Sequence, residues 1–356
     1  MKSMLRKLLS PAVLLSLKNT LKSLDELIFP YFSKSRFLSS FYYCFLSNQF
    51  RREHQAVLQG RLQYQSSLND IKASSVLLRR NTHRLEKGLI MQPRRSVFAE
   101  VYINETVECF AKCLAGAEFC IEELKWAQDV LSQFFSVTGS TEVLDKARER
   151  FDALTLKCFE KNKASLPYQY QQRVTSTVTQ QELHDLFKQR RSVRWYQEKN
   201  VENYMLEQAI DMASQAPSAC NRQPFEFYTV TDMNKAAKVS SLAMGTAGFS
   251  DNIPAVIVVV GDLSAYPTER DRHIIYIDAS LASMQLMLSL DTMGLSSCPL
   301  NWPDLDVPER KMSKLLNLPT YKRPIMLIAV GYAQSDGLIP YSSKKTSQTL
   351  RKEVNL

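Results

Sequence analysis

The chain has 356 residues and a formal net charge of +9, with 45 Lys and Arg residues against 36 Asp and Glu residues. This length favours two domains, or one domain with a large extension. Only 10 residues are glycine, and no GxGxxG or GxxxxGKS/T motif occurs, which excludes a glycine-rich phosphate-binding loop. The positive charge favours anionic partners such as phosphorylated cofactors. No nucleic-acid-binding module is recognisable, so we expect no nucleic-acid partner.

The 7 cysteines favour a reducing, cytoplasmic location, because their number is odd and no disulfide-framework spacing is present. Cys109, Cys113 and Cys120 share one helical face, but a metal site needs a fourth ligand and tighter pairing. We therefore expect no metal and three buried cysteines. No run of about 20 uncharged apolar residues is present, so no membrane-spanning helix is expected. The apolar run Leu8–Leu17 contains Pro11 and lacks an A-x-A cleavage site, which favours an amphipathic helix over a leader.

Residues 1–50 form a basic, aromatic-rich N-terminal segment, in which seven Lys and Arg residues outnumber Asp25 and Glu26. Leucines recur at helical spacing as far as Ile28, and Pro30 is expected to end this helix. An aromatic cluster follows, composed of Phe37, Phe41, Tyr42, Tyr43, Phe45 and Phe50. Two interpretations stay open. The segment either makes peripheral contact with an anionic membrane, or packs against its own protein or a dimer partner.

Residues 51–165 are expected to form a helical extension. Helical patterns cover residues 49–89, 97–131 and 141–161. Gly88 is a candidate helix C-cap at the end of the first pattern. Close to it, His83, Arg84 and Lys87 form either an anion site or a solvated, charged helix end.

The pattern changes after a Ser- and Thr-rich candidate linker at 163–180. Helices are then expected at Gln181–Gln189, Glu202–Gln215 and Ile274–Met293, the last with a stop at Gly294. Strands are expected at Phe225–Val230, Ala255–Val260 and Ile325–Val330. Strands separated by helices indicate a layered sheet, so residues 181–350 are predicted to be an α+β domain.

A basic segment with the character of a phosphate site follows the helix at 181–189. It contains three guanidiniums and a hydroxyl within five residues: Arg190, Arg191, Ser192 and Arg194. Arginine forks bind phosphate bidentately, and serine adds a neutral donor. A solvated basic turn is the alternative interpretation.

Three further segments contain residues that could contact a ligand. Ala216–Phe225 has two prolines, and its short polar groups suit the edge of a heteroaromatic ring or a ribityl chain; a structural turn is the alternative. Its candidate residues are Pro217, Ser218, Asn221 and Gln223. Cys298–Pro303 follows the long helix, and the pair Lys344-Lys345 lies in a Ser/Thr-rich tail.

In this order and spacing, the four segments resemble the nitroreductase-type FMN oxidoreductase family over Gln181–Leu350. Tyr276–Ala282, at the start of the long helix, and the sequence GLSSCPL after it also resemble the family. The resemblance implies an α+β homodimer with FMN in two equivalent sites at the subunit interface. No metal is implied.

The resemblance also implies a role for each candidate residue. Arg190 and Ser192 would hold the FMN phosphate with Arg191 nearby, and Lys344 or Lys345 would complete that site. Arg194 would lie at the pyrimidine edge, where a cation stabilises the charge that appears on reduction. Three residues would line the ring near N5: Pro299, Leu300 and Asn301. Four would come from the other subunit: Pro217, Ser218, Asn221 and Gln223.

The activity implied by the resemblance is hydride transfer from NAD(P)H through flavin N5 to a small-molecule electron acceptor. The cofactor supplies this chemistry, and no catalytic acid or base stands out. Some relatives have an acidic residue and glycine at the positions of Asn301 and Trp302, so a bulky Trp302 would either narrow the pocket or alter the access of the hydride donor. The alternative is a flavin-binding or degenerate scaffold at a membrane-associated assembly. The long extension, which contains His-Arg-Leu-Glu-Lys-Gly, resembles those of nitroreductase-like proteins from polysaccharide loci.

Overall fold

The computed structural model describes residues 10–157, 159 and 164–354. It divides into two compact units, Met1–Gln55 and Ala56–Leu356. Two parts of the predictions lie outside the described residues: the start of the N-terminal helix, including Leu8, and Cys158.

The first unit contains helix α2 (Pro11–Phe32), helix α3 (Arg36–Phe41) and a π-helical turn η1 (Tyr42–Leu46). The prediction that Pro30 ends the helix was wrong by two residues. Pro30 lies inside the last turn of α2, which continues to Phe32 and has Ser33 as its C-cap. The predicted aromatic cluster is confirmed around Tyr42, whose ring centroid lies 5.6 Å from that of Phe32 and 5.0 Å from that of Tyr43.

The second unit begins with a helical region. Its helices are α4 (Arg51–Ser67, which starts in the first unit), α5 (Val76–Leu89), α6 (Ile103–Ala115), α7 (Ile121–Val137) and α8 (Glu142–Asp152). The pattern at 49–89 is therefore two helices, and Gly88 lies inside α5 instead of capping it. A Cβ at Gly88 would meet Phe98 Cε2 at 2.2 Å, so the glycine allows close packing. Cys109 and Cys113 are buried in the core as expected, whereas Cys120 is exposed.

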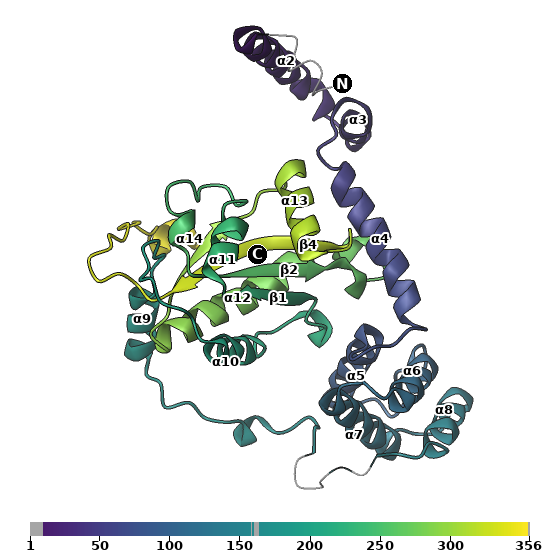
Figure 1. Cartoon of the computed structure of the whole chain (residues 1–356). Helices are drawn as coiled ribbons and strands as arrows, with labels where there is room; N and C mark the ends of the chain where they lie inside the picture. Colours follow the sequence, from purple (N-terminus) through teal and green to yellow (C-terminus); the bar gives the residue numbers. More distant parts are fainter. Residues whose placement is uncertain (1–9, 158, 160–163, 355–356) are drawn as a thin grey trace. The chain divides into compact units, whose positions relative to one another are not determined.

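The C-terminal domain is built on a four-stranded antiparallel sheet of order β1-β2-β4-β3 (Figure 1). The strands are β1 (Phe225–Val230), β2 (Ala255–Asp262), β3 (Ser296–Asn301) and β4 (Lys322–Gly331). The three predicted strands are confirmed, and β3 was missed. The α+β class is likewise confirmed.

Helices cover both faces of this sheet. Val256, Val258 and Val260 of β2 face one cluster, which includes residues of α11 (Met233–Ser240) and α13 (Asp306–Leu316). Ala255, Ile257 and Val259 face the other cluster, with α10 (Asn203–Ala213) and α12 (Ile274–Thr292). Because successive side chains of a strand alternate between faces, the apolar run of β2 fills both cores.

Shorter elements complete the unit. They are α9 (Gln180–Gln189), α14 (Ser347–Leu350) and the 3-10 turns η2 (Tyr170–Gln172), η3 (Ala219–Asn221), η4 (Ser250–Asn252), η5 (Leu263–Ala265) and η6 (Glu269–Asp271). The predicted glycine stop of α12 is confirmed, since Gly294 has a φ of 80°. Glu269–Thr292 is long and apolar enough to span a membrane, but half of its most apolar window is buried, as in the core helix of a globular domain.

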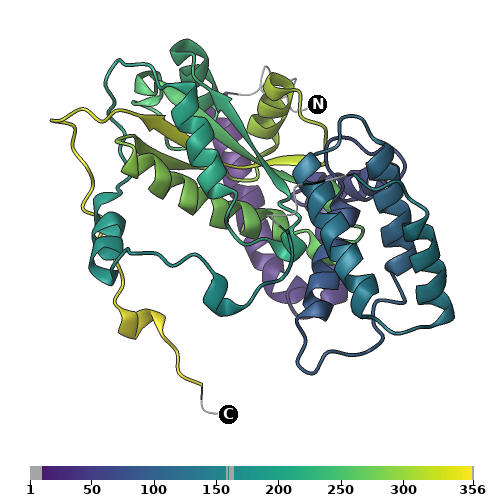
Figure 2. The same ribbon diagram turned by 90° about the horizontal axis from the view of Figure 1, so that it is seen from below.

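The helical region packs against the C-terminal domain within the second unit (Figure 2). Ala56 and Val57 of α4 share a buried cluster with Leu263, Tyr266 and Ile275. Helix α5 also contacts the η3 turn. The extension and the sheet domain therefore meet beside the loop that carries Ser218 and Asn221.

Candidate functional site

The basic segment runs along the edge of strand β3. Arg190 is the C-cap residue of α9, and the chain then extends so that Ser192 forms a parallel bridge with Ser297. The backbone N–H of Val193 donates to the carbonyl of Ser297 over 3.1 Å. The structure therefore brings the first predicted group of residues beside the strand that carries the third.

Polar atoms at this junction lack protein partners. Arg190 Nε and Ser297 Oγ are buried and make no hydrogen bond among the described residues. A buried donor without a partner costs about 1–3 kcal/mol, so the site fits a ligand that supplies acceptor oxygens. Next to it, burial raises the pKa of the Cys298 thiol, although Arg194 and Ser192 partly oppose that shift. Cys298 therefore stays a neutral packing residue.

Arg194 is held in place from two sides. Its Nη1 donates to the carbonyl of Ser192 over 3.2 Å, and its guanidinium lies 5.9 Å from the ring centroid of Phe249. Asn252 Nδ2 donates to the Arg194 carbonyl over 2.8 Å. We did not select Asn252 from the sequence, because a lone asparagine before a strand carries no local signal. Trp195, Phe249 and Asn252 also line a pocket of about 690 Å³.

The three predicted residues of β3 alternate along the strand. Pro299 and Asn301 are exposed, whereas Leu300 is buried in the sheet core. Trp302 packs into the core of the sheet domain. Its side chain is only 7% exposed, and its Nε1 donates to Glu309 Oε1 of α13 over 3.3 Å.

The loop at 217–223 lies elsewhere in the same chain. Its backbone N–H at Ala219 donates to Asp278 Oδ2 of α12 over 2.9 Å, and Ser218 Oγ accepts from the N–H of Gln223 over 3.1 Å. Burial raises the pKa of Asp278, although the Ala219 N–H partly opposes the shift. Among the residues that the structure describes, no hydrogen bond joins this loop to the 190–194 segment.

A second pocket of about 390 Å³ borders this loop. It is lined by Ser74 and Arg79 of the helical region and by residues of the C-terminal domain, among them Arg222, Gln223 and Phe225. We did not predict from the sequence that the helical region reaches the loop, because the contacting residues are far apart in the chain.

Comparison with known proteins identifies the domain. The model of the nitroreductase family matches residues 187–248 and 234–332, which include the basic segment at 190–194 and the loop at 217–223. The C-terminal half carries a nitroreductase-family domain. A protein of Archaeoglobus fulgidus named "Putative NADH dehydrogenase/NAD(P)H nitroreductase" is 28% identical over 149 residues, covering 41% of this chain and 83% of that protein. Mouse iodotyrosine deiodinase 1 is 25% identical over 197 residues, covering 46% and 67%.

Solved structures were also compared with the chain. An FMN-dependent nitroreductase from Clostridium difficile aligns with a TM-score of 0.41 at 25% identity, covering 48% of this chain and 98% of that one. A nitroreductase family protein from Streptococcus pneumoniae aligns with a TM-score of 0.42 at 22% identity, covering 48% and 100%.

The nitroreductase-family domain exposes an apolar stripe on α12. Ile277, Leu281 and Met284 follow one another at helical spacing and are 52%, 44% and 38% exposed. Leu183 and Phe187 of the neighbouring helix α9 are exposed as well. These exposed residues lie on a helix whose other residues, such as Ala279 and Leu286, fill the core.

The predicted lysines lie in the tail that follows the nitroreductase-family domain. Lys344 and Lys345 are exposed and precede the short helix α14. Neither makes a hydrogen bond to Arg190 or Ser192 among the described residues. Their role at a phosphate stays a prediction.

Proposed function

We propose that the protein is an FMN-dependent oxidoreductase that transfers hydride from NAD(P)H to a small electron acceptor. The observation that carries this proposal is the buried, unpartnered Arg190 Nε beside Ser297 in a nitroreductase-family domain. An anionic group at this position would satisfy a donor that the protein leaves unpaired. The phosphate of FMN is the anion that the family resemblance implies.

The proposal includes a homodimer. No hydrogen bond joins residues 190–194 to residues 217–223 among the described residues, and the family resemblance implies that FMN contacts both groups. We therefore propose that each group is a half-site, and that a complete site combines residues 190–194 of one protomer with residues 217–223 of its partner. The exposed stripe Ile277, Leu281 and Met284 offers an isologous contact, since a twofold axis brings the same surface of each copy together.

Each half-site has a defined task in this proposal. Arg190 and Ser192 bind the phosphate with Arg191 nearby, and Arg194 lies at the pyrimidine edge. Pro299 and Asn301, both exposed, face the ring, while Leu300 anchors the strand in the core. Bound FMN supplies hydride acceptance and donation at N5; the chain supplies binding, orientation and positive charge.

The acceptor is defined only by class. Relatives with this domain are named for nitroreductase and for iodotyrosine deiodinase activity. A nitroaromatic compound and a halogenated phenol are therefore the two acceptors to test first.

The test is an absorbance spectrum of the purified full chain, recorded without oxygen before and after addition of NADH or NADPH. Flavin bands that bleach, and return when an acceptor is added, support the proposal. Flavin bands that persist with both nucleotides contradict the NAD(P)H-dependent reaction. A colourless protein that does not take up FMN contradicts the proposal as a whole.

As a second function we propose peripheral contact of the first unit with an anionic membrane. Its aromatic side chains Phe37 and Phe45 are 77% and 67% exposed, and basic residues such as Arg36 lie beside them. Aromatic and basic groups together suit the headgroup region of a bilayer. The test is co-sedimentation with anionic and neutral vesicles, using the full chain and a variant without residues 1–50. Vesicle binding that survives the deletion would rule out this segment as the anchor.

A further inference from the structure

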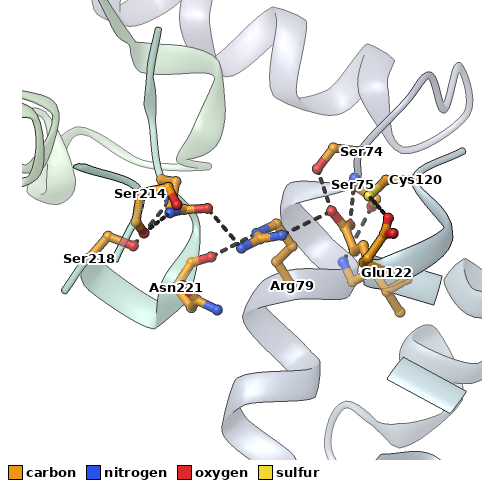
Figure 3. A network of polar contacts seen from close by, with 11 residues as sticks. Ser74, Ser75, Arg79, Cys120, Glu122, Ser214, Ser218 and Asn221 are labelled. Carbon is orange, nitrogen blue, oxygen red and sulfur yellow. Dashed lines mark hydrogen bonds and ion pairs between the residues drawn. The ribbon is translucent and has the colours of Figure 1, made fainter. Parts of the chain in front are cut away.

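Arg79 of helix α5 contacts three groups at once (Figure 3). Its Nε donates to the carbonyl oxygen of Asn221 over 2.7 Å, and its Nη2 donates to Gln223 Oε1 over 3.1 Å. Its Nη1 donates to Glu123 Oε2 of α7 over 3.1 Å. One planar guanidinium thus links the helical region to the loop for which the family resemblance implies flavin contacts.

The carboxylate of Glu123, which pairs with Arg79, is also held by two other hydrogen-bond donors. The Glu123 residue is 4% exposed, and it accepts hydrogen bonds from Ser74 Oγ over 2.7 Å and from the Ser75 N–H over 3.0 Å. A buried carboxylate with several donors holds its partner in one orientation, since any other geometry leaves a charge unpaired. Glu123 therefore aims Arg79 at the loop.

The loop needs such support. Cys220, Asn221 and Gln223 have φ values of 54°, 51° and 49°, in the left-handed region that residues other than glycine rarely adopt. Backbone strain of this kind persists only where surrounding contacts fix it. On the other side, the N–H of Ala219 is held by Asp278 of α12. The loop is therefore clamped between α12 and the helical region.

The two amide side chains of the loop, Asn221 and Gln223, differ in their hydrogen bonding. The Gln223 amide is engaged twice, because Oε1 accepts from Arg79 while Nε2 donates to the carbonyl of Ser214 over 2.7 Å. Asn221 bonds to Arg79 only through its backbone carbonyl. Its side-chain amide makes no hydrogen bond among the described residues and stays available to a ligand.

We infer that Arg79 is a positioning residue of the flavin site, and that the helical region is a working part of the nitroreductase-family site. Arg79, aimed by Glu123, holds the loop so that the Asn221 side chain faces the flavin of the partner subunit, while Gln223 serves the clamp. This inference rests on the proposed FMN function. It assigns a task to the helical extension, for which the sequence offered none.

The test uses the full chain stripped of FMN, with FMN affinity and the visible spectrum of bound FMN as its readouts. Arg79→Met alone would leave Glu123 buried and unpaired, so it is combined with Glu123→Gln. We expect the double variant to bind FMN about 10- to 100-fold more weakly, because the loop that carries Asn221 is no longer held in the binding geometry. At saturating FMN its flavin bands should shift, because the ring meets a different loop. Arg79→Lys, which keeps the charge without the fork, should fall between the double variant and the wild type.

Arg61→Met is the matched control. Arg61 of α4 also crosses to the C-terminal domain, where it donates to the Pro267 carbonyl over 3.2 Å and pairs with Glu269. It does not touch the loop, so this variant should keep the wild-type affinity and spectrum. An equal loss in Arg61→Met would overturn the inference, because docking of the helical region in general would then explain the effect.

A folded double variant with wild-type FMN affinity and spectrum would also overturn the inference. If the double variant does not fold, Arg79→Lys alone decides, and wild-type binding in that variant counts against the role. A wild-type chain that does not bind FMN refutes the proposed function and the inference together. Loss confined to the Arg79 variants of an FMN-binding protein supports both.

Discussion

Replacing Arg190 by methionine should weaken FMN binding and leave the FMN-free protein as stable as before, or more stable. A charge-assisted hydrogen bond contributes about 1.5–3 kcal/mol. At 1.4 kcal/mol for each factor of ten, this loss corresponds to about 10- to 150-fold weaker binding. In the FMN-free protein, by contrast, Arg190 Nε is buried without a partner, so methionine removes a group whose burial costs about 1–3 kcal/mol. The opposite signs distinguish a ligand-binding residue from a structural one.

FMN titration by fluorescence quenching and urea unfolding of the FMN-free protein measure the two effects. Arg310→Met is a suitable control, because Arg310 lies in the same domain with its side chain 69% exposed and pairs with Asp306 at 3.0 Å. An Arg190→Met protein with unchanged FMN affinity would remove Arg190 from the site. A large loss of stability without FMN would show instead that its guanidinium supports the fold.

Three other perturbations have defined outcomes. Gly88→Ala should lower the free energy of unfolding by about 1–2 kcal/mol, since overpacking against Phe98 outweighs about 1 kcal/mol of helix propensity; urea unfolding measures it, and Phe98→Leu should restore stability. If the proposed homodimer forms through the α12 stripe, Leu281→Glu should give a monomer in light scattering and abolish FMN binding, whereas a dimeric variant would exclude this stripe as the interface. Because burial raises the pKa of Asp278 in the folded state, its contribution to stability is greatest below the ordinary Asp pKa of about 3.9 and is lost as pH rises through the raised value. Asp278→Asn should therefore flatten this decline in unfolding measurements across pH, and a parallel pH profile would refute the assignment.

Strand β2 and helix α12 could be predicted from the sequence because the composition and length of each segment favour one type of secondary structure. The run Ala255–Val260 is apolar throughout, short and rich in the β-branched residues Val and Ile, which favours a strand buried on both faces. Helix α12 has the length and apolar content of a core helix, with Gly294 after it. In both cases the chemistry of neighbours in sequence determines the structure.

Strand β3 was missed because its local sequence argues against a strand. Ser296–Asn301 contains two serines and a proline, which lacks the N–H that a central strand needs. The structure resolves the conflict by placing β3 at the edge of the sheet, paired with β4 alone among the named strands. An edge position is a property of the whole sheet, so it cannot be read from six residues.

The candidate site also depends on contacts between residues far apart in the chain, which local sequence patterns do not reveal. The basic segment at 190–194 and the loop at 217–223 were each found from their own residues, but the clamp that holds the loop joins Arg79 to positions 142 and 144 residues away. One local signal existed: Glu123 occupies a buried position on α7 among apolar residues, and a buried carboxylate requires a cation. That signal predicts that a partner exists without saying which arginine supplies it. The loop at 217–223 is strained and is held partly by the helical region. Removal of the helical region should therefore let this loop change conformation. FMN binding by the nitroreductase-family domain should then depend on the extension.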